Sequence, residues 1–306
     1  MKGSTDLTVH SLESNNPGPI VLILAGVHGD EYEPMLAIYK LHKLIKNNLK
    51  CGKVILVPIV NNSAYMLGSR VGVDGKDLAR CCPGDPLGSE TMKAAAEISA
   101  LIQESDYLID LHTGGRLFDI YPMIGYMLHS DQQILNKQRL MAKVFGLPGV
   151  WGTDAKPNGR TLSVARDAGV PAIYAEFGGP GPAREIVIES YVQGCLNVLN
   201  HLGMLNQDAI EMEWEGYTFF LQEDRKPNSG FLQGKMLASC EGIFNSSVKV
   251  GQRIEAGQVW GEICEPKTGF VTYPKAEASG FVLFVRSEPH VKKGESLGGI
   301  LELDEN

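Results

Sequence analysis

The stretch that decides the fold is residues 19–60, PIVLILAGVHGDEYEPMLAIYKLHKLIKNNLKCGKVILVPIV. It contains two runs rich in Val, Ile and Leu that have the length of strands, Pro19–Ala25 and Lys53–Val60. Between them, Glu33–Lys46 repeats its apolar residues at the spacing of an amphipathic helix. Strand-length apolar runs that alternate with helical segments are typical of a mainly parallel sheet covered by helices.

The same alternation continues to about residue 202. The further predicted elements are helices at Ser89–Ser105, Gln132–Phe145 and Glu185–Leu202 and strands at Tyr107–Leu111 and Pro171–Phe177. These strands lack polar alternation, as expected where both faces of a sheet are buried. We therefore predict an α/β fold with a mainly parallel central sheet and helices on both faces.

After about Met204 the helical periods vanish, and short apolar runs alternate with turn residues, which is typical of a small all-β domain. The stretches VKVGQRIEAGQVWGEI, YPKAEASGFVLFV and VKKGESLGGIL resemble the barrel-sandwich hybrid of lipoyl and biotinyl carrier domains. Lys267 lies near the position of the modified lysine of such domains, but its Pro and Thr neighbours argue against lipoylation. We predict an α/β domain at residues 1–206 and a C-terminal β domain at 207–306.

Composition narrows the range of partners. The net charge is −8, and the Lys and Arg residues are scattered, so nucleic acid and anionic membranes are not expected partners. The N-terminal residues lack the apolar core of a signal peptide, which predicts a cytoplasmic protein. The six cysteines form no CxxC pair, and in a reducing compartment they are expected to be free thiols.

The loop after the first buried strand contains the first candidate metal ligands. It reads GVHGDE over residues 26–31, at the carboxyl end of a strand, where ligands usually bind in open α/β sheets. His28 and Glu31 are close enough in sequence for a tight loop to aim both side chains at one point. The glycines beside His28 relieve the backbone crowding of such a turn.

The ends of two further predicted strands carry side chains that could complete a metal site with His28 and Glu31. A catalytic zinc needs three N or O ligands and one open position, and His112, after the strand Tyr107–Leu111, is the expected third ligand. Asp110 could orient a neighbouring group or make a structural strand-end hydrogen bond. Glu176 ends the strand Pro171–Phe177, and a carboxylate there is costly unless it is solvated, paired or catalytic. Because these strand ends should open on the same edge of the sheet, a catalytic role for Glu176 is favoured.

Four motifs occur in an order that resembles a known family. HGDE, SRVGVDGKDLAR, IDLHTG and AEFGGPG follow one another over roughly residues 20–200, as in the aspartoacylase and succinylglutamate desuccinylase family, relatives of the zinc carboxypeptidases. The C-terminal β domain fits the bacterial two-domain members. The resemblance implies one Zn²⁺ per chain, held by His28, Glu31 and His112. It also implies that Glu176 is the general base that activates water and passes the proton to the leaving nitrogen.

The resemblance also assigns roles to arginines. Arg70 aligns with the arginine that stabilises the oxyanion, and Arg80 with the one that binds a substrate carboxylate. The family motif has Asn where this chain has Ala79, which removes an amide that could bind that carboxylate. Arg166 is a candidate for a further substrate-binding arginine, although a solvated helix position explains it equally well.

These observations predict hydrolysis of an amide bond in a small N-acyl amino acid or a related compound. One alternative is a metallocarboxypeptidase that acts on short peptides, because the same zinc core serves both reactions. The other is a metal-binding or ligand-binding protein without catalysis, in which Ala79 marks lost function. The ligand set also suits divalent cations other than zinc. The β domain is expected to shield the active-site entrance or to mediate contacts in a homo-oligomer.

Overall fold

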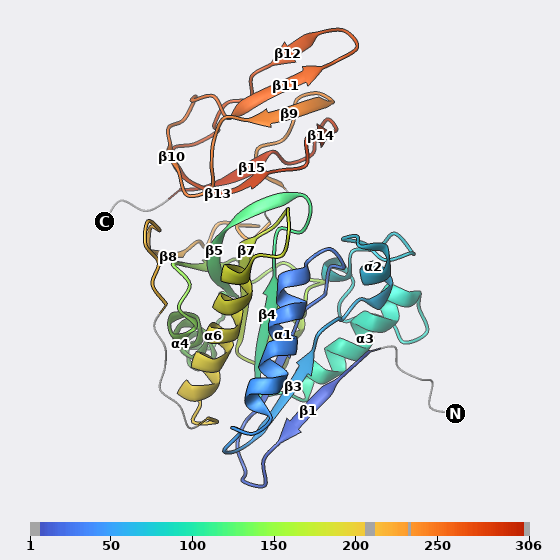
Figure 1. Ribbon diagram of the computed structural model, residues 1–306, viewed down its shortest axis with the longest axis vertical. Coiled ribbons are helices and arrows are strands. Elements are labelled where there is room, and N and C mark those ends of the chain that lie inside the picture. Colours follow the sequence, from blue (N-terminus) through green and yellow to red (C-terminus); the bar gives the residue numbers. More distant parts are fainter. Residues whose placement is uncertain (1–6, 206–211, 232–233, 303–306) are drawn as a thin grey trace.

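The stretch quoted above forms two parallel strands joined by a helix in the computed structural model (Figure 1). They are strand β2 (Ile20–Leu24), helix α1 (Tyr32–Ile45) and strand β3 (Lys53–Val57), and β2 pairs with β3 along its whole length. The predicted parallel arrangement is thus confirmed where the sequence indicates it most clearly. The structure describes residues 7–205, 212–231 and 234–302.

Four parallel strands form the centre of the main sheet. Their order is β3-β2-β4-β7, where β4 is Tyr107–His112 and β7 is Ala172–Gly178. On either side of these four strands the sheet becomes mixed. On one side, β1 runs antiparallel to β3. On the other side, β5 runs antiparallel to β7, β6 pairs with β5, and β8 pairs with β6. These flanking strands are β1 (His10–Glu13), β5 (Phe118–Met127), β6 (Gly149–Thr153) and β8 (Phe220–Glu223). The prediction of a mainly parallel sheet is therefore confirmed for these four central strands.

Helices cover both faces of this sheet, as predicted (Figure 1). Alternate strand residues point to opposite sides, so Ile23 belongs to one hydrophobic core and Leu22 and Leu24 to another. The first core packs against α1, α4 and α6, and the second against α3 and α5. The helices not yet placed are α2 (Asn62–Leu67), α3 (Glu90–Gln103), α4 (Gln132–Phe145), α5 (Thr161–Ala168), α6 (Glu185–His201) and the short 3-10 helix η1 (Leu78–Arg80).

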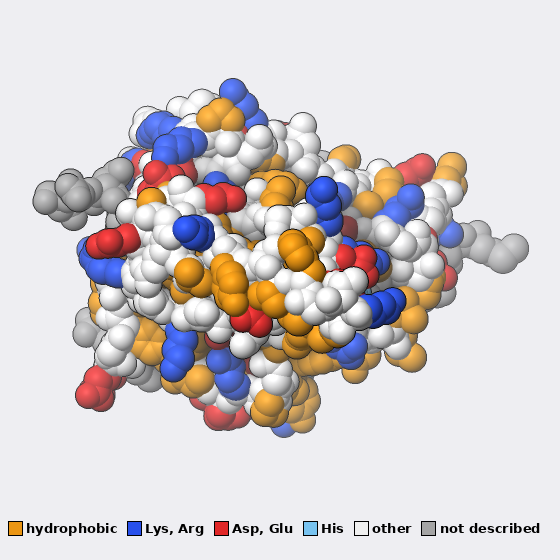
Figure 2. All heavy atoms as spheres, turned by 90° about the horizontal axis from the view of Figure 1, so that it is seen from above, with side chains coloured by type: hydrophobic (Ala, Val, Ile, Leu, Met, Phe, Trp, Pro, Cys, Tyr) orange, Lys and Arg blue, Asp and Glu red, His pale blue; other side chains and the backbone are white. Residues whose placement is uncertain are grey.

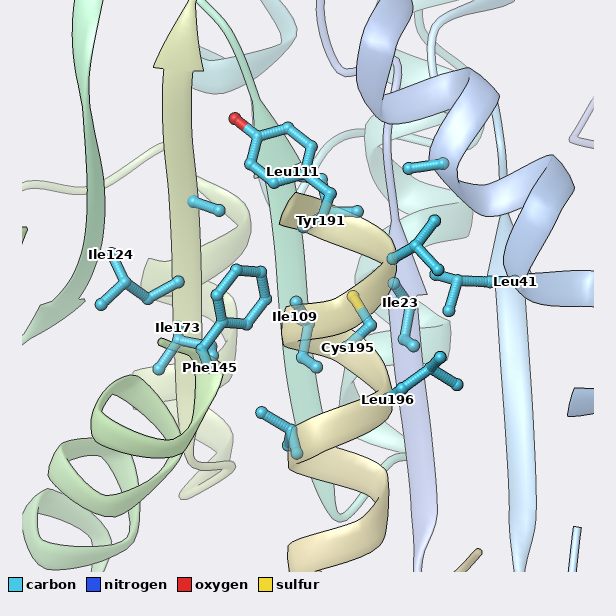
Figure 3. Close-up of a cluster of buried hydrophobic side chains, with 14 of the residues drawn as sticks. Ile23, Leu41, Ile109, Leu111, Ile124, Phe145, Ile173, Tyr191, Cys195 and Leu196 are labelled. Carbon is cyan, nitrogen blue, oxygen red and sulfur yellow. The ribbon is translucent and has the colours of Figure 1, made fainter. Parts of the chain in front are cut away.

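Figure 3 shows how α6 packs on the first core. Tyr191, Cys195 and Leu196 project from α6 toward the sheet, where Ile23 and Ile109 come from neighbouring strands. Tyr191 and Cys195 are completely buried. Such contacts stabilise the fold by roughly 25 cal/mol for each Å² of apolar area that they bury. They hold β2 and β4 in place beneath α6.

The C-terminal region forms a second sheet and also extends the first one. Strands β9 (Gly242–Ser246), β11 (Gly261–Glu265), β12 (Phe270–Thr272) and β14 (His290–Val291) form the separate sheet. Strand β13 pairs with β5, and β10 and β15 pair with β13. These three are β13 (Gly280–Arg286), β10 (Arg253–Ile254) and β15 (Gly298–Leu301). The predicted domain boundary between residues 206 and 207 falls outside the described residues.

The outer surface of the C-terminal region is seen from above in Figure 2, where hydrophobic side chains lie interspersed with polar and charged ones. Ile243 of β9 and Phe270 of β12 are among the exposed large hydrophobic residues. Within the described part of the chain, no helix is long and apolar enough to cross a membrane.

Candidate active site

The loop between β2 and α1 is held tightly against α2. At Gly29, an added Cβ would lie 2.0 Å from the backbone carbon of Ala64, so only glycine fits there. Gly26, with φ of +66°, has the left-handed backbone that favours glycine. This close packing directs His28 and Glu31 inward, and both are almost completely buried.

His112 and Glu176 come to the same place through strand register. His112 is the last residue of β4 and lies directly opposite Glu176 of the parallel strand β7. Tyr191 of α6 donates a hydrogen bond to the backbone oxygen of His112 and so fixes the end of β4. The predicted meeting of the three strand ends at one edge is what the structure shows.

Both imidazoles converge on one carboxylate. His28 Nδ1 lies 2.7 Å from Oε1 of Glu31, and His112 Nδ1 lies 2.9 Å from Oε2 of the same side chain. One ligand atom from each of the three residues can be chosen so that all lie within 4.8 Å of one another. Two imidazole nitrogens and a carboxylate are the donor set of many catalytic zinc sites, so these residues fit a divalent cation.

Each histidine has a carboxylate behind it. Nε2 of His28 lies 3.2 Å from Oδ1 of Asp77, and Nε2 of His112 lies 3.0 Å from Oδ1 of Asp110. The Asp110 contact is close, but it is not aligned as a hydrogen bond. In both histidines Nδ1 therefore faces the common centre while Nε2 faces an aspartate, as is usual for metal-binding imidazoles. Asp110 was predicted as one possible orienting group, whereas the contact of Asp77 with His28 was not predicted.

The two glutamates of the cluster have opposite pKa shifts. Burial alone would raise the pKa of Glu31, but the imidazoles of His28 and His112 hold it well below its ordinary value. Burial raises the pKa of Glu176, and the charge of Glu31 raises it further. Oε2 of Glu176 is buried and has no hydrogen-bond partner. An unpaired buried carboxylate oxygen beside this centre is costly unless it has a further partner or a chemical task.

The candidate cavity extends from this cluster to three arginines, Arg70, Arg80 and Arg160. Nε and Nη2 of Arg70 lie 3.1 and 3.0 Å from Oδ2 of Asp77, which fixes the guanidinium beside His28. Arg80 is exposed at the cavity mouth, where its Nη1 donates to the backbone oxygen of Ala79 at 2.7 Å. Both of the predicted arginines thus reach the cavity.

Arg166 lies elsewhere. It is not among the described residues that line the cavity, and its guanidinium is bound to the preceding loop. Nη1 donates to the backbone oxygens of Ala155 and Pro157, and Nη2 donates to Asn158 Oδ1 at 2.8 Å. The geometry gives no support to the predicted substrate contact of Arg166.

Arg160 and Tyr174 line the cavity and were not predicted. Tyr174 lies two residues before Glu176 in β7, on the same face of the sheet, so strand periodicity could have indicated it. Arg160 holds the N-cap position of α5, where a short polar residue is usual and the helix dipole disfavours a cation. No local pattern in the sequence indicates that Arg160 reaches the cavity.

Comparisons with known proteins agree with this geometry. The family model described as the succinylglutamate desuccinylase/aspartoacylase catalytic domain matches residues 17–202. The N-alpha-acetyl-L-2,4-diaminobutyric acid deacetylase of Halomonas elongata is 30% identical over 295 residues, which cover 94% of this chain and 84% of that protein.

Solved structures share the fold along nearly the whole chain. A succinylglutamate desuccinylase/aspartoacylase from Rhodobacter sphaeroides has a TM-score of 0.86 and 25% identity, covering 97% of this chain and 89% of its own. An aspartoacylase family protein from Mesorhizobium loti has a TM-score of 0.80 and 26% identity, covering 98% and 90%. The chain belongs to the succinylglutamate desuccinylase/aspartoacylase family.

Proposed function

We propose that the protein is a zinc-dependent deacylase that hydrolyses the amide bond of a small N-acyl amino acid. The observation that carries this proposal is the convergence of His28, Glu31 and His112 beside the unpartnered Oε2 of Glu176. Family membership and the deacetylase relative from Halomonas elongata support the same reaction class.

His28, Glu31 and His112 would hold one Zn²⁺ per chain through two Nδ1 atoms and a carboxylate. When bound, zinc lowers the pKa of a water molecule to about 7 and polarises a carbonyl oxygen. Asp77 and Asp110 keep the two imidazoles oriented for this task.

The remaining chemistry belongs to side chains of this protein. Oε2 of Glu176 takes a proton from the attacking water as the new C–O bond forms, and it delivers this proton to the nitrogen as the C–N bond breaks. The products are a carboxylic acid and a free amine, so no other reactant is needed. Arg70, fixed by Asp77, supplies a positive charge for the oxygen on which negative charge develops.

Arg80 is suited to bind the carboxylate of the substrate at the cavity mouth. Ala79 lines the cavity beside it and offers a methyl group where the family motif has an amide. Its backbone N–H donates to Oδ1 of Asp77 at 2.9 Å, so this residue shapes the loop rather than contacting the substrate through a polar side chain.

The C-terminal region argues for small substrates over peptides. Gly230 lines the cavity, and the ring of Phe231 lies 5.6 Å from the guanidinium of Arg80. These residues narrow the cavity beside Arg80. A peptide substrate would need an open groove through which the rest of its chain could leave, so a narrowed cavity favours a small substrate.

Metal analysis and one substitution test the proposal. Purified protein should contain about one zinc per chain. Glu176→Gln should keep the metal and lose nearly all hydrolysis of N-acetylated amino acids, because the amide cannot accept the proton. Normal turnover by the metal-loaded variant would refute Glu176 as the base. Binding of a ligand without turnover of any amide or ester would favour the non-catalytic alternative.

A further inference from the structure

Tyr174 lies deep in the active-site cavity. It precedes Glu176 by two residues in β7, so its side chain is on the same face of the sheet, about 6–7 Å farther from the carboxyl end of the strand. In the neighbouring strand β4 it is paired with Asp110, which is completely buried. A substrate group that extends past Glu176 toward the interior of the sheet would therefore meet the ring of Tyr174.

The position of this ring depends on Gly125. Gly125 of β5 is paired with Tyr174, and a Cβ at this glycine would lie 2.2 Å from Cε1 and Cζ of the ring. Its φ is not in the left-handed region, so the close approach of the ring, and not the backbone conformation, requires glycine here. The ring also packs against the second core and against the hydrophobic cluster that contains Phe118. It cannot move toward β5 to make room for a larger ligand.

The proposed function indicates which part of the substrate faces Tyr174. The substrate nitrogen lies near Glu176, which delivers a proton to it, and the carboxylate lies at Arg80. The α-carbon joins these two groups, so the amino-acid side chain starts between Glu176 and Arg80. Because a trans amide is planar, the acyl group points away from the α-carbon.

Arg160 shows that Tyr174 borders the space between Glu176 and Arg80. A Cβ at Gly159 would lie 2.8 Å from the backbone carbon of Arg80, so Arg160, the next residue, lies beside Arg80. Burial raises the pKa of Tyr174, and the charge of Arg160 opposes this rise, because the two side chains are close together. Arg160 and Tyr174 thus line the cavity where the side chain of the substrate would extend.

We propose that Tyr174 is a specificity-determining residue whose ring limits the length of the amino-acid side chain of the substrate. This rests on the proposed deacylase function and narrows its substrate class to N-acyl amino acids with short side chains. Met127 lies two residues farther into the sheet than Gly125 and on the same face, and Leu162 of α5 also lines this end of the cavity. A smaller residue at position 174 would open the cavity toward these apolar side chains, where a longer aliphatic chain could be buried.

A series of substrates of increasing length tests this with the zinc-loaded protein. The N-acetyl derivatives of alanine, 2-aminobutyrate, norvaline and norleucine differ by one methylene at a time. In the wild type, kcat/KM should fall at one step of this series by at least about tenfold, since one methylene in a pocket is worth roughly 10–200-fold. Tyr174→Ala should move this fall to a longer side chain. Tyr174→Phe is the matched control and should keep the wild-type limit, because it retains the ring, and the hydroxyl that it removes has no hydrogen-bond partner among the residues that the structure describes.

A second variant perturbs the ring without removing it. The methyl group of Gly125→Ala would displace the ring of Tyr174 into the cavity, so kcat/KM for the longest side chain that the wild type accepts should fall at least about tenfold relative to N-acetylalanine. The double variant Gly125→Ala/Tyr174→Ala should lack this effect, since it has no ring to displace. The ratio of N-butyrylalanine to N-acetylalanine turnover should stay the same in Tyr174→Ala, because the acyl group points away from this residue.

A binding measurement separates this inference from the proposed function. In the Glu176→Gln background, calorimetry should show that Tyr174→Ala tightens binding of N-acetylnorleucine at least about tenfold relative to N-acetylalanine. If the wild-type protein hydrolyses no N-acyl amino acid, the proposed function fails, while this measurement still tests the length limit. Equal use of all four side chains by the wild type would overturn the inference. So would an unchanged limit and unchanged binding in Tyr174→Ala, or a change in acyl preference in place of side-chain preference.

Discussion

Replacement of Asp110 by Asn tests whether the buried carboxylate behind His112 tunes the metal centre. Asp110 is completely buried, and its Oδ1 lies 3.0 Å from Nε2 of His112. Asn has nearly the same shape, and its amide can still contact Thr161, which now bonds Oδ2 at 2.5 Å. The change therefore removes one negative charge and leaves the packing in place.

The expected effect is a loss of zinc affinity without loss of the fold. Carboxylates that support metal-binding histidines contribute roughly 10–100-fold to metal affinity, or about 1.4–2.8 kcal/mol. We expect the upper part of this range for Asp110→Asn, because Asp110 is completely buried and its charge is weakly screened. The loss of zinc affinity in Asp77→Asn should lie nearer the lower end of this range, since the side chain of Asp77 is 17% exposed.

The zinc dissociation constant can be measured by competition with a chromophoric chelator, with circular dichroism as a check of folding. Thr161→Val is the matched control, because it removes the hydrogen bond to Asp110 and keeps the charge. It should lower stability by about 1–3 kcal/mol and change the zinc affinity much less than Asp110→Asn. Unchanged zinc affinity in a folded Asp110→Asn variant would show that this carboxylate does not support the centre.

Other substitutions and measurements probe the frame around the site. Gly29→Ala places a methyl 2.0 Å from the backbone of Ala64, so urea unfolding should show a loss of about 1–3 kcal/mol, together with weaker zinc binding. Glu223→Gln removes the charge that accepts two hydrogen bonds from Arg139, at 2.7 and 2.9 Å, and should cost about 0.5–1 kcal/mol at pH 7, because the side chain of Arg139 is 39% exposed. Because Arg139 lowers the pKa of Glu223, its contribution is present above the ordinary value of 4.5 and is lost as the pH falls through the lowered pKa. The difference in unfolding free energy between Glu223→Gln and the wild type should therefore become smaller as the pH is lowered. Burial raises the pKa of Cys82 to about 12, so at pH 8 iodoacetamide should modify it only after unfolding, as mass spectrometry of digests can show.

The parts of the site that follow strand ends were predictable from the sequence. His28, His112 and Glu176 each lie at or near the carboxyl end of an apolar run, and parallel strands bring such ends to one edge. Their meeting depends only on the identity and direction of neighbouring strands. Local apolar runs give the strand positions, and the alternation of strands with helices gives the parallel direction of these strands.

The remaining parts depend on packing that a local pattern does not encode. Arg160 reaches the cavity only because α5 lies across the sheet and Gly230 packs against it. Strand β5 was not predicted, and Pro122 within it argues against an internal strand. The structure accommodates this proline where the register between β5 and β7 shifts, between Ile120 and Met123, so the ladder is already irregular there.

The antiparallel course of β5 also explains why the C-terminal region is part of the candidate active site. One edge of β5 pairs with β7, and its other edge pairs with β13 near its start and with β6 farther along, while β6 in turn pairs with β8. The chain that leaves β8 is then held by Asp154, which accepts from the N–H of Asn228 at 2.9 Å and donates to Ser229. These contacts place Gly230 against Arg160. Removal of the C-terminal region would expose the apolar residues of β5 that β13 covers and would take away the wall that positions Arg160. Correct folding and the shape of the cavity should therefore depend on the same set of contacts.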